Sequence, residues 1–283
     1  MSNARALRRQ TTGLVLKGAC LLSAVLPTLL LIGLLWMVIQ KGWSAINWEF
    51  LTTKPSYLRG TLGVLPNILN TLYLLAATLV LVLPPGIGAA IYLNEYCPKG
   101  RIASLIEYAA ETLAGIPSVI YGLAGMLIFS TRIGTSLASG ALTMAMMTLP
   151  LVLRSAQESL RRVPNELREA SYALGGGKLV TLRRVILPCC VDGIATGCVL
   201  AAARVVGESA ALLYTAGLAN TLAGPMKALG QPGSTLTVSL YVYAKERGRF
   251  DVAFAIGLLL ILLTVVLNGL VTAIRHRAER RVK

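Results

Sequence analysis

Residues 163–175 read Val163-Pro164-Asn165-Glu166-Leu167-Arg168-Glu169-Ala170-Ser171-Tyr172-Ala173-Leu174-Gly175. Proline is favoured at the first position of a helix and glycine just past its end, so this segment is predicted to be a short, well-delimited helix. Apolar side chains recur at helical spacing along one of its faces, at Val163, Leu167, Ala170 and Leu174. Long apolar runs precede and follow the segment, which places the helix outside the bilayer that those runs would cross.

Apolar runs of this kind recur along the whole chain. Of its 283 residues, 55% are hydrophobic and only 14% are charged, too few to cover the surface of a soluble domain. A helix needs about 20 apolar residues to cross the hydrocarbon core, and a backbone without water must pair its own hydrogen bonds. We therefore predict an all-α membrane protein with six transmembrane helices, at about 18–40, 67–93, 108–130, 135–153, 190–218 and 252–274.

The first, third and fourth predicted spans have features that bear on their assignment. The run from Gly18 to Ile39 is longer than the core of a signal peptide, which has about 7–15 residues, so we predict a retained first span. The third and fourth spans are separated by a tight polar turn at 131–134. The fourth span is diluted by small and polar residues, which are common where membrane helices pack closely.

The net charge is +15, and the basic residues lie mainly in the segments between and beyond the predicted spans. Basic residues flank the apolar runs and form no single patch with stacking aromatics, which argues against nucleic-acid binding. Lysine and arginine are concentrated in the N-terminus, in segments 94–107 and 154–188, and in the C-terminal tail, so both termini are predicted to be cytoplasmic. The predicted organisation is a cytoplasmic N-terminus (1–17), a first span with an external interfacial loop (18–66), a transmembrane domain (67–275) and a basic cytoplasmic tail (276–283).

The sequence contains no residue pattern typical of a catalytic or metal site. The five cysteines and the single histidine form no ligand pattern, so no metal site is predicted. A membrane-embedded enzyme would need clustered His, Asp or Glu near the interface, and no such cluster is seen. The glycine run at 175–177 lacks the spacing of a phosphate-binding P-loop and is followed by Lys178-Leu179. We therefore expect no ATP and no other cofactor on this chain.

The segment 169–188 resembles the loop of permease subunits of ABC importers, which reads E-A-A, three residues, Gly, nine residues, then Ile-x-Leu-Pro. Here Ser171 replaces the second alanine and Val185 the isoleucine. The resemblance implies that residues 164–175, within the loop 154–188, form a coupling helix that sits in a groove of a separate ATPase. The alternative is an amphipathic loop helix without a partner. The implied coupling residues are Glu169, Ala170, Ser171, Gly175, Leu187 and Pro188.

Two charged residues, Arg204 and Glu208, fall inside the fifth predicted span. A charge at the centre of a membrane helix costs at least about 2.5–3.5 kcal/mol and is by default a functional hypothesis. Four residues apart, the two would share a helix face and could pair. Either the pair only satisfies itself within the bundle, or it faces a polar pathway, where the planar fork of arginine suits a phosphate.

Residues 203–216, ARVVGESAALLYTA, resemble a signature of the A-type subunit of phosphate ABC permeases, with Ser209 in place of Thr and Ala211 in place of Pro. The segments 70–72, 85–96 and 116–123 agree with the same family. Pro117 also predicts a kink that exposes a carbonyl near Ser118, as a packing feature or as part of an anion path. The resemblance implies a type I ABC importer permease fold and the pathway residues Arg204, Glu208, Ser209, Ser118 and Asn70.

The same resemblance implies an assembly in a bacterial plasma (inner) membrane. Its other members would be a second, C-type phosphate permease, a pair of ATPase subunits that bind ATP and Mg, and an extracytoplasmic phosphate-binding protein. Arg204 alone does not separate phosphate from other tetrahedral oxyanions. A permease for sulfate or molybdate therefore remains an alternative, and a membrane-embedded enzyme is a more distant one.

Overall fold

The computed structural model describes the backbone of residues 2–55, 62–97 and 100–282, and their side chains except those of 2–12, 14–15 and 274–282. The described side chains do not include several basic residues, namely Arg5, Arg8, Arg9, Arg59, Lys99, Arg275 and those of the tail 276–283. Within the described part, the regular structure is helical throughout and contains no strand.

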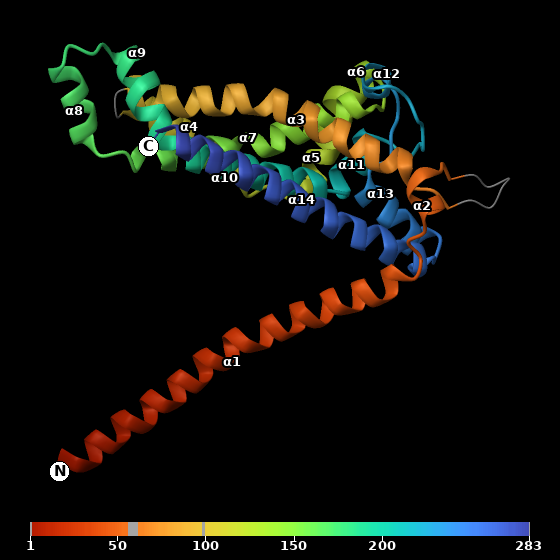
Figure 1. The fold of residues 1–283 in the computed structure, drawn as a ribbon, viewed down its shortest axis with the longest axis horizontal. Helices are drawn as coiled ribbons and strands as arrows, with labels where there is room; N and C mark the ends of the chain where they lie inside the picture. The colour runs from red at the N-terminus through yellow and green to blue at the C-terminus, as the bar shows by residue number, and fades with distance from the viewer. Residues whose placement is uncertain (1, 56–61, 98–99, 283) are drawn as a thin grey trace.

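The long helices other than α1 run roughly along one bundle axis, with two ends that we call the α8 end and the α2 end (Figure 1). In chain order they are α1 (Ser2–Trp43), α2 (Trp48–Thr52), α3 (Leu65–Ile91), η1 (Tyr92–Tyr96), α4 (Arg101–Ala114), α5 (Ser118–Gly125), η2 (Met126–Ser130), α6 (Thr131–Ile133), α7 (Leu137–Arg161), α8 (Asn165–Ala173), α9 (Lys178–Thr181), η3 (Leu182–Ile186), α10 (Leu187–Gly207), α11 (Ala210–Thr215), α12 (Pro225–Leu229), α13 (Leu236–Tyr241), η4 (Val242–Glu246) and α14 (Phe250–Val282). The four η segments are π-helical turns.

Five helical stretches of the described chain are long and apolar enough to cross a membrane: Leu16–Trp43, Leu65–Tyr96, Leu137–Arg161, Lys178–Gly207 and Phe250–Ala273. A sixth candidate is the pair Arg101–Ala114 and Ser118–Ile133, whose two arms are bent by 100°. The predicted all-helical class is confirmed. The fourth span continues past the predicted 153 and ends at Arg161.

The third span, predicted at 108–130 with a kink at Pro117, is a sharply bent pair of helices whose first arm begins earlier than predicted. Its first arm, α4, begins at Arg101 and ends at Ala114, and the second arm starts after Pro117, whose backbone is extended (ψ 141°). Proline has no N–H and clashes with the preceding turn, which breaks a helix. The hydroxyl of Tyr121 donates to the carbonyl of Leu113 at 2.8 Å, so the second arm supplies a partner for the end of the first.

The prediction of a continuous fifth span at 190–218 is wrong. The helix α10 ends at Gly207, Glu208 is extended (ψ 125°), and a short helix resumes at Ala210. The hydroxyl of Thr237 donates to the carbonyl of Glu208 at 2.9 Å. The break therefore lies where a side chain from the α13 segment can satisfy it.

Figure 1 shows α1 leaving the bundle, joined to it only near its C-terminal end. There a Cβ on Gly42 would lie 2.6 Å from the carbonyl oxygen of Phe254, and the ammonium of Lys41 lies 5.2 Å from the centre of the Phe254 ring. The apolar side chains of residues 16–37 are exposed, as a lipid-facing helix requires.

The main core lies between α3, α7, α10 and α11, where Leu74, Met144, Val205 and Leu212 are fully buried. A second core at the α8 end gathers Ala90, Leu93, Leu160, Val163 and Ile186, which come from the end of α3, from η1, from the end of α7 and the turn after it, and from η3. Helices in both cores meet through small residues, a common way for membrane helices to pack closely.

A buried polar network fixes the α2 end of α3. The amide nitrogen of Asn67 donates to Ser234 O at 3.1 Å and to Ser239 Oγ at 2.6 Å, and that of Asn70 donates to Ser234 O at 3.3 Å. The hydroxyl of Thr71 accepts from the N–H of Leu236 at 3.0 Å. Three side chains of α3 thereby satisfy irregular backbone that leads into α13.

The contact between α5 and α11 gives a direct test of this packing. A Cβ on Gly122 would lie 2.7 Å from Ala211 Cα, a backbone atom that cannot move alone, whereas a Cβ on Gly88 would meet nothing within 4 Å. We expect Gly122→Ala to destabilise the protein by about 1–3 kcal/mol through overpacking. Thermal unfolding of the detergent-solubilised protein measures this, with Gly88→Ala as the matched control at or above the wild-type midpoint. Equal midpoints for the two variants would contradict the close approach.

Candidate functional site

The helix α8 is built as a self-contained unit between two stop signals. Pro164 was predicted at the first helical position, but its backbone is extended (ψ 142°) and α8 begins one residue later, at Asn165. At its end Gly175 has φ +82°, as predicted for the residue just past the helix. The N–H of Gly176 donates to Ser171 O and that of Gly175 to Tyr172 O, both at 2.9 Å, which is the Schellman pairing that closes a helix.

The two faces of α8 have different surroundings. None of its residues is fully buried. Leu167 and Leu174, predicted to lie on the apolar face, are 41% and 90% exposed, and Ala170 between them is also exposed. Arg168 and Ser171 are half-buried and point back toward the chain. Val163, predicted on the same face, precedes α8 and is buried in the second core. The apolar face of α8 itself is left open, while the polar face attaches α8 to the rest of the protein.

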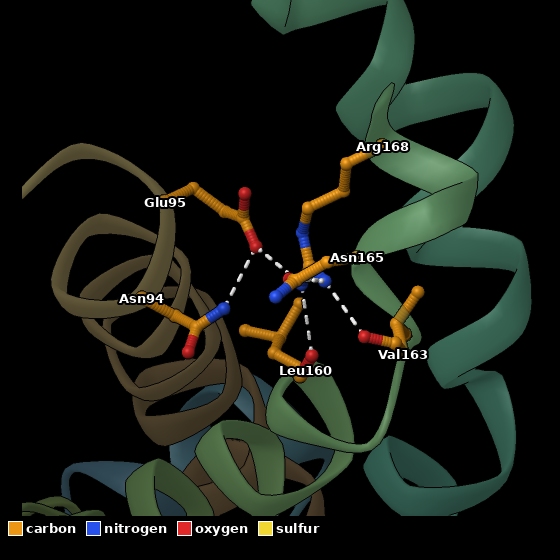
Figure 2. A network of polar contacts seen from close by, with 6 residues as sticks. All are labelled: Asn94, Glu95, Leu160, Val163, Asn165 and Arg168. Atoms are coloured by element: carbon orange, nitrogen blue, oxygen red, sulfur yellow. Dashed lines mark hydrogen bonds and ion pairs between the residues drawn. The ribbon is translucent and has the colours of Figure 1, made fainter. Parts of the chain in front are cut away.

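Arg168 makes most of that attachment. Figure 2 shows its side chain reaching from α8 toward Glu95 of η1. One guanidinium nitrogen donates to Glu95 Oε1 at 2.9 Å and to Leu160 O at 3.0 Å; the other donates to Val163 O at 2.7 Å and to Asn165 Oδ1 at 3.3 Å. Leu160 and Val163 lie at the C-terminal end of α7, where carbonyls lack partners within the helix and a cation is stabilised.

The carboxylate of Glu95 has a second hydrogen-bond partner. The amide of Asn94 donates to Glu95 Oε1 at 2.7 Å. The Arg168 and Glu95 side chains are only 14% and 12% exposed, whereas the other ion pairs among the described residues are all at least 40% exposed on both partners. A pocket of about 690 Å³ opens beside this pair, lined by both side chains and by Glu107 and Arg161.

The other predicted coupling residues occupy three places. The hydroxyl of Ser171, which stands where the loop pattern has alanine, lies 2.8 Å from that of Thr181 on α9. Glu169 is exposed on α8. Leu187 and Pro188 begin α10, and Leu187 packs against the core at the α8 end. Their roles in coupling stay predictions.

The sequence analysis assigned no functional site to Glu95 or Arg168. Glu95 lies at the end of the predicted second span, and Arg168 lies in the predicted loop helix. The only signal was an acidic residue at the end of one span and a basic residue on a helix that follows another. Several carboxylates and arginines share that end of the bundle, so the pairing needed the structure.

The predicted ion pair between Arg204 and Glu208 does not form. Because α10 ends at Gly207, the two residues are not on one continuous helix, and the carboxylate of Glu208 instead accepts from the N–H of Ala211 at 3.2 Å. Arg204 lies in the last turn of α10, is exposed, and makes no side-chain hydrogen bond or ion pair within the described part of the chain.

The predicted pathway residues fall into two groups. Ser118 begins α5, and Ser209 lies in the break between α10 and α11; both are half-buried. The helices α5 and α11 pack directly together at Gly122 and Ala211. Glu208 precedes α11 and accepts from the N–H of Ala211, and Arg204 lies four residues earlier, in the last turn of α10. Asn70 lies elsewhere, 1% exposed in the buried network at the α2 end. Its pathway role stays a prediction, and the placement favours a structural one.

The closure of α8 can be tested at Gly175. Alanine at φ +82° should cost about 1–2 kcal/mol, because the left-handed region is unfavourable for side chains. Trypsin cleaves after Arg168 and Lys178, and we expect its cleavage in this loop to become about 5- to 30-fold faster, the ratio that 1–2 kcal/mol corresponds to. Gly177→Ala, at φ −72° with open space around the Cβ, is the control. Cleavage that is no faster in Gly175→Ala than in the control would contradict the cap.

Comparisons with known proteins agree with this arrangement. Residues 86–283 match the family described as "Binding-protein-dependent transport system inner membrane component". The chain is 34% identical to "Phosphate transport system permease protein PstA 1" of Mycobacterium tuberculosis (strain CDC 1551 / Oshkosh), over 97% of this chain and 92% of the relative. It is 35% identical to "Probable ABC transporter permease protein YqgI" of Bacillus subtilis (strain 168), over 75% and 73%.

Solved structures share the fold at low identity. A chain of a bacterial alginate ABC transporter in complex with an alginate pentasaccharide-bound periplasmic protein superposes with a TM-score of 0.67, at 17% identity, over 92% of this chain and 94% of that chain. A chain of the MetNI methionine ABC transporter in an inward-facing conformation gives 0.59, at 19% identity, over 74% and 94%. The chain therefore belongs to the family of binding-protein-dependent transport system inner membrane components and has the ABC importer permease fold.

Proposed function

We propose that this chain is the A-type permease subunit of an ATP-driven importer of inorganic phosphate. It would form half of the translocation pathway and couple to a separate ATPase through residues 164–175. The observation that carries the coupling is α8 itself: a helix that starts after Pro164, is closed at Gly175, lies outside the bundle and has an open apolar face. The observation that supports phosphate is the set of relatives whose names describe phosphate transport permeases.

The exposed face of α8 has the chemistry of a docking surface. Leu167, Ala170 and Leu174 present apolar area that no other part of the described chain covers. A helix laid by its apolar face into a groove is a common mode of recognition. We assign the groove to an ATPase subunit, which would bind ATP and Mg and do the hydrolysis, and we assign no cofactor to this chain.

Arg204 is the strongest candidate for contact with the transported anion. Its charge has no ion-pair partner within the described residues, and a cation in or near the membrane needs compensation. Its position in the last turn of α10 is favourable, because the negative end of the helix dipole lies there. A phosphate oxygen pair would satisfy the guanidinium fork. Glu208, held by the N–H of Ala211, would keep the local net charge low so that the anion is not trapped.

The assembly follows from this role. Arg204 would face a second, C-type permease across the pathway, and an extracytoplasmic phosphate-binding protein would deliver the anion at the α2 end. Both chain ends point toward the α8 end of the bundle (Figure 1). With α8 on the ATPase, both termini would be cytoplasmic in a bacterial inner membrane. A permease for sulfate or molybdate is the remaining alternative for the substrate.

The substrate is tested by ATP-dependent uptake of radiolabelled phosphate into proteoliposomes that contain the whole complex. We expect unlabelled phosphate to compete and sulfate and molybdate not to. Arg204→Ala should slow uptake at low phosphate by roughly 10- to 100-fold, the loss of a hydrogen-bonded charged contact. Glu208→Gln keeps an acceptor for the Ala211 N–H and should have a smaller effect.

The matched control removes one positive charge elsewhere on the chain. Arg132 is exposed in the turn between the third and fourth spans, and Arg132→Ala should transport as wild type. Uptake abolished by sulfate or molybdate would reassign the substrate. Normal uptake by Arg204→Ala in a correctly assembled complex would remove this residue from the pathway and direct attention to Ser118 and Ser209.

A further inference from the structure

Arg168 is the point at which α8 meets the end of the second span. The helix α8 has no buried residue of its own, so its polar contacts carry much of its attachment. Ser171 connects it to Thr181 of α9, within the same loop. Arg168 is different, because Glu95 belongs to η1, about seventy residues earlier in the chain. A displacement of α8 therefore acts on another span through this side chain.

A single guanidinium joins three elements here. It contacts the carbonyls of Leu160 and Val163 at the end of α7, the side chain of Asn165 at the start of α8, and Glu95 on η1. Arginine can do this because its donors are fixed in one planar fork. With both partners less than 15% exposed, the attraction is screened by water and salt far less than in a surface pair.

Glu95 is part of a long continuous body. The helix and its π-helical turn run without interruption over Leu65–Tyr96. At the far end of that body, Asn67 and Thr71 hold the backbone at Ser234 and Leu236. The second span thus has a polar attachment at each end: one to α8, and one to the irregular segment before α13.

A second, weaker contact also joins the loop to the end of the second span. The ammonium of Lys178, which begins α9, lies 5.8 Å from the centre of the Tyr96 ring. Two neighbouring residues of η1 therefore contact the two helices of the loop: Glu95 contacts α8, and Tyr96 contacts α9.

We propose that Arg168 and Glu95 form the joint that transmits the movement of α8 to the second span, and through it to the segment around Ser234 at the opposite end. This inference rests on the proposed function, in that α8 is taken to move with an ATPase. Arg168 and Glu95 are positioning residues: they touch neither substrate nor nucleotide. Their loss should therefore separate ATP hydrolysis from transport while the complex stays assembled.

The test measures phosphate uptake and ATP hydrolysis side by side in proteoliposomes that hold the complete complex. For Arg168→Ala and Glu95→Gln, the ratio of uptake to hydrolysis should fall by about fivefold or more, the size of a typical coupling free energy. Arg168→Lys keeps the charge but cannot reproduce the fork, so its ratio should lie between those of Arg168→Ala and the wild type. The control is Arg162→Ala, whose side chain is 80% exposed and pairs loosely with Glu158 at 3.8 Å; its ratio should not change.

Two outcomes would overturn the proposal. If Arg168→Ala and Glu95→Gln lower uptake and hydrolysis together, with the ratio intact, the pair serves only the fold of the loop. If the ATPase copurifies with neither variant, the pair is required for assembly and not for transmission.

A second readout does not depend on the substrate. Hydrogen–deuterium exchange of residues 90–97 should change when ATP and vanadate trap the wild-type complex, and this change should be lost in Arg168→Ala but not in Arg162→Ala. An unchanged response in Arg168→Ala would contradict the joint. If the wild-type complex shows this response but takes up no phosphate, the assigned substrate is wrong and the joint stands.

Discussion

Pairing of backbone polar groups at helix breaks is the constraint on which this structure depends. A membrane offers no water to an open N–H or C=O, so an interrupted helix must find its partners within the protein. Each interruption here has a side chain beside it. Tyr121 donates to Leu113 at the bend between α4 and α5, Thr237 donates to Glu208 after α10, and Asn67 and Thr71 pair with the segment before α13. Each of these contacts supplies a partner to a backbone group at a bend or break in the bundle.

The same rule explains how α8 is held outside the bundle. Its end is closed by the Gly175 and Gly176 amides, and Arg168 pairs with the carbonyls at the end of α7. The helix is therefore fixed in place by polar contacts, and its apolar face is left for a partner. The second span lies between the two polar regions, with Glu95 at one end and Asn67 at the other. This arrangement places one continuous helix between the docking surface of α8 and the opposite end of the bundle.

The sequence was sufficient for the class of fold and for α8, and insufficient for the breaks. Apolar runs predict spans because transfer into lipid depends mainly on composition, and the proline and glycine around α8 mark its ends locally. Pro117 predicts a kink, but nothing local gives the 100° angle between α4 and α5. The break at Gly207 has no such marker, because it lies inside an apolar run and its stabilising partner, Thr237, comes from another segment. The predicted pair of Arg204 and Glu208 failed for the same reason: four-residue spacing matters only on an unbroken helix. The partnership of Arg168 with Glu95 depends on tertiary packing and has no local signature.

The seating of α8 on a separate ATPase is the central claim, and thiol labelling tests it most directly. In a chain whose five native cysteines are replaced by alanine, Leu174→Cys places a thiol at a position that is 90% exposed on α8, and Met226→Cys places one that is 85% exposed on α12 at the other end. The rate of maleimide labelling is compared for the detergent-solubilised protein with and without the ATPase subunits. The account predicts that assembly strongly slows labelling at position 174 and leaves position 226 unchanged. Equal labelling rates at position 174 in the free and assembled protein would contradict it.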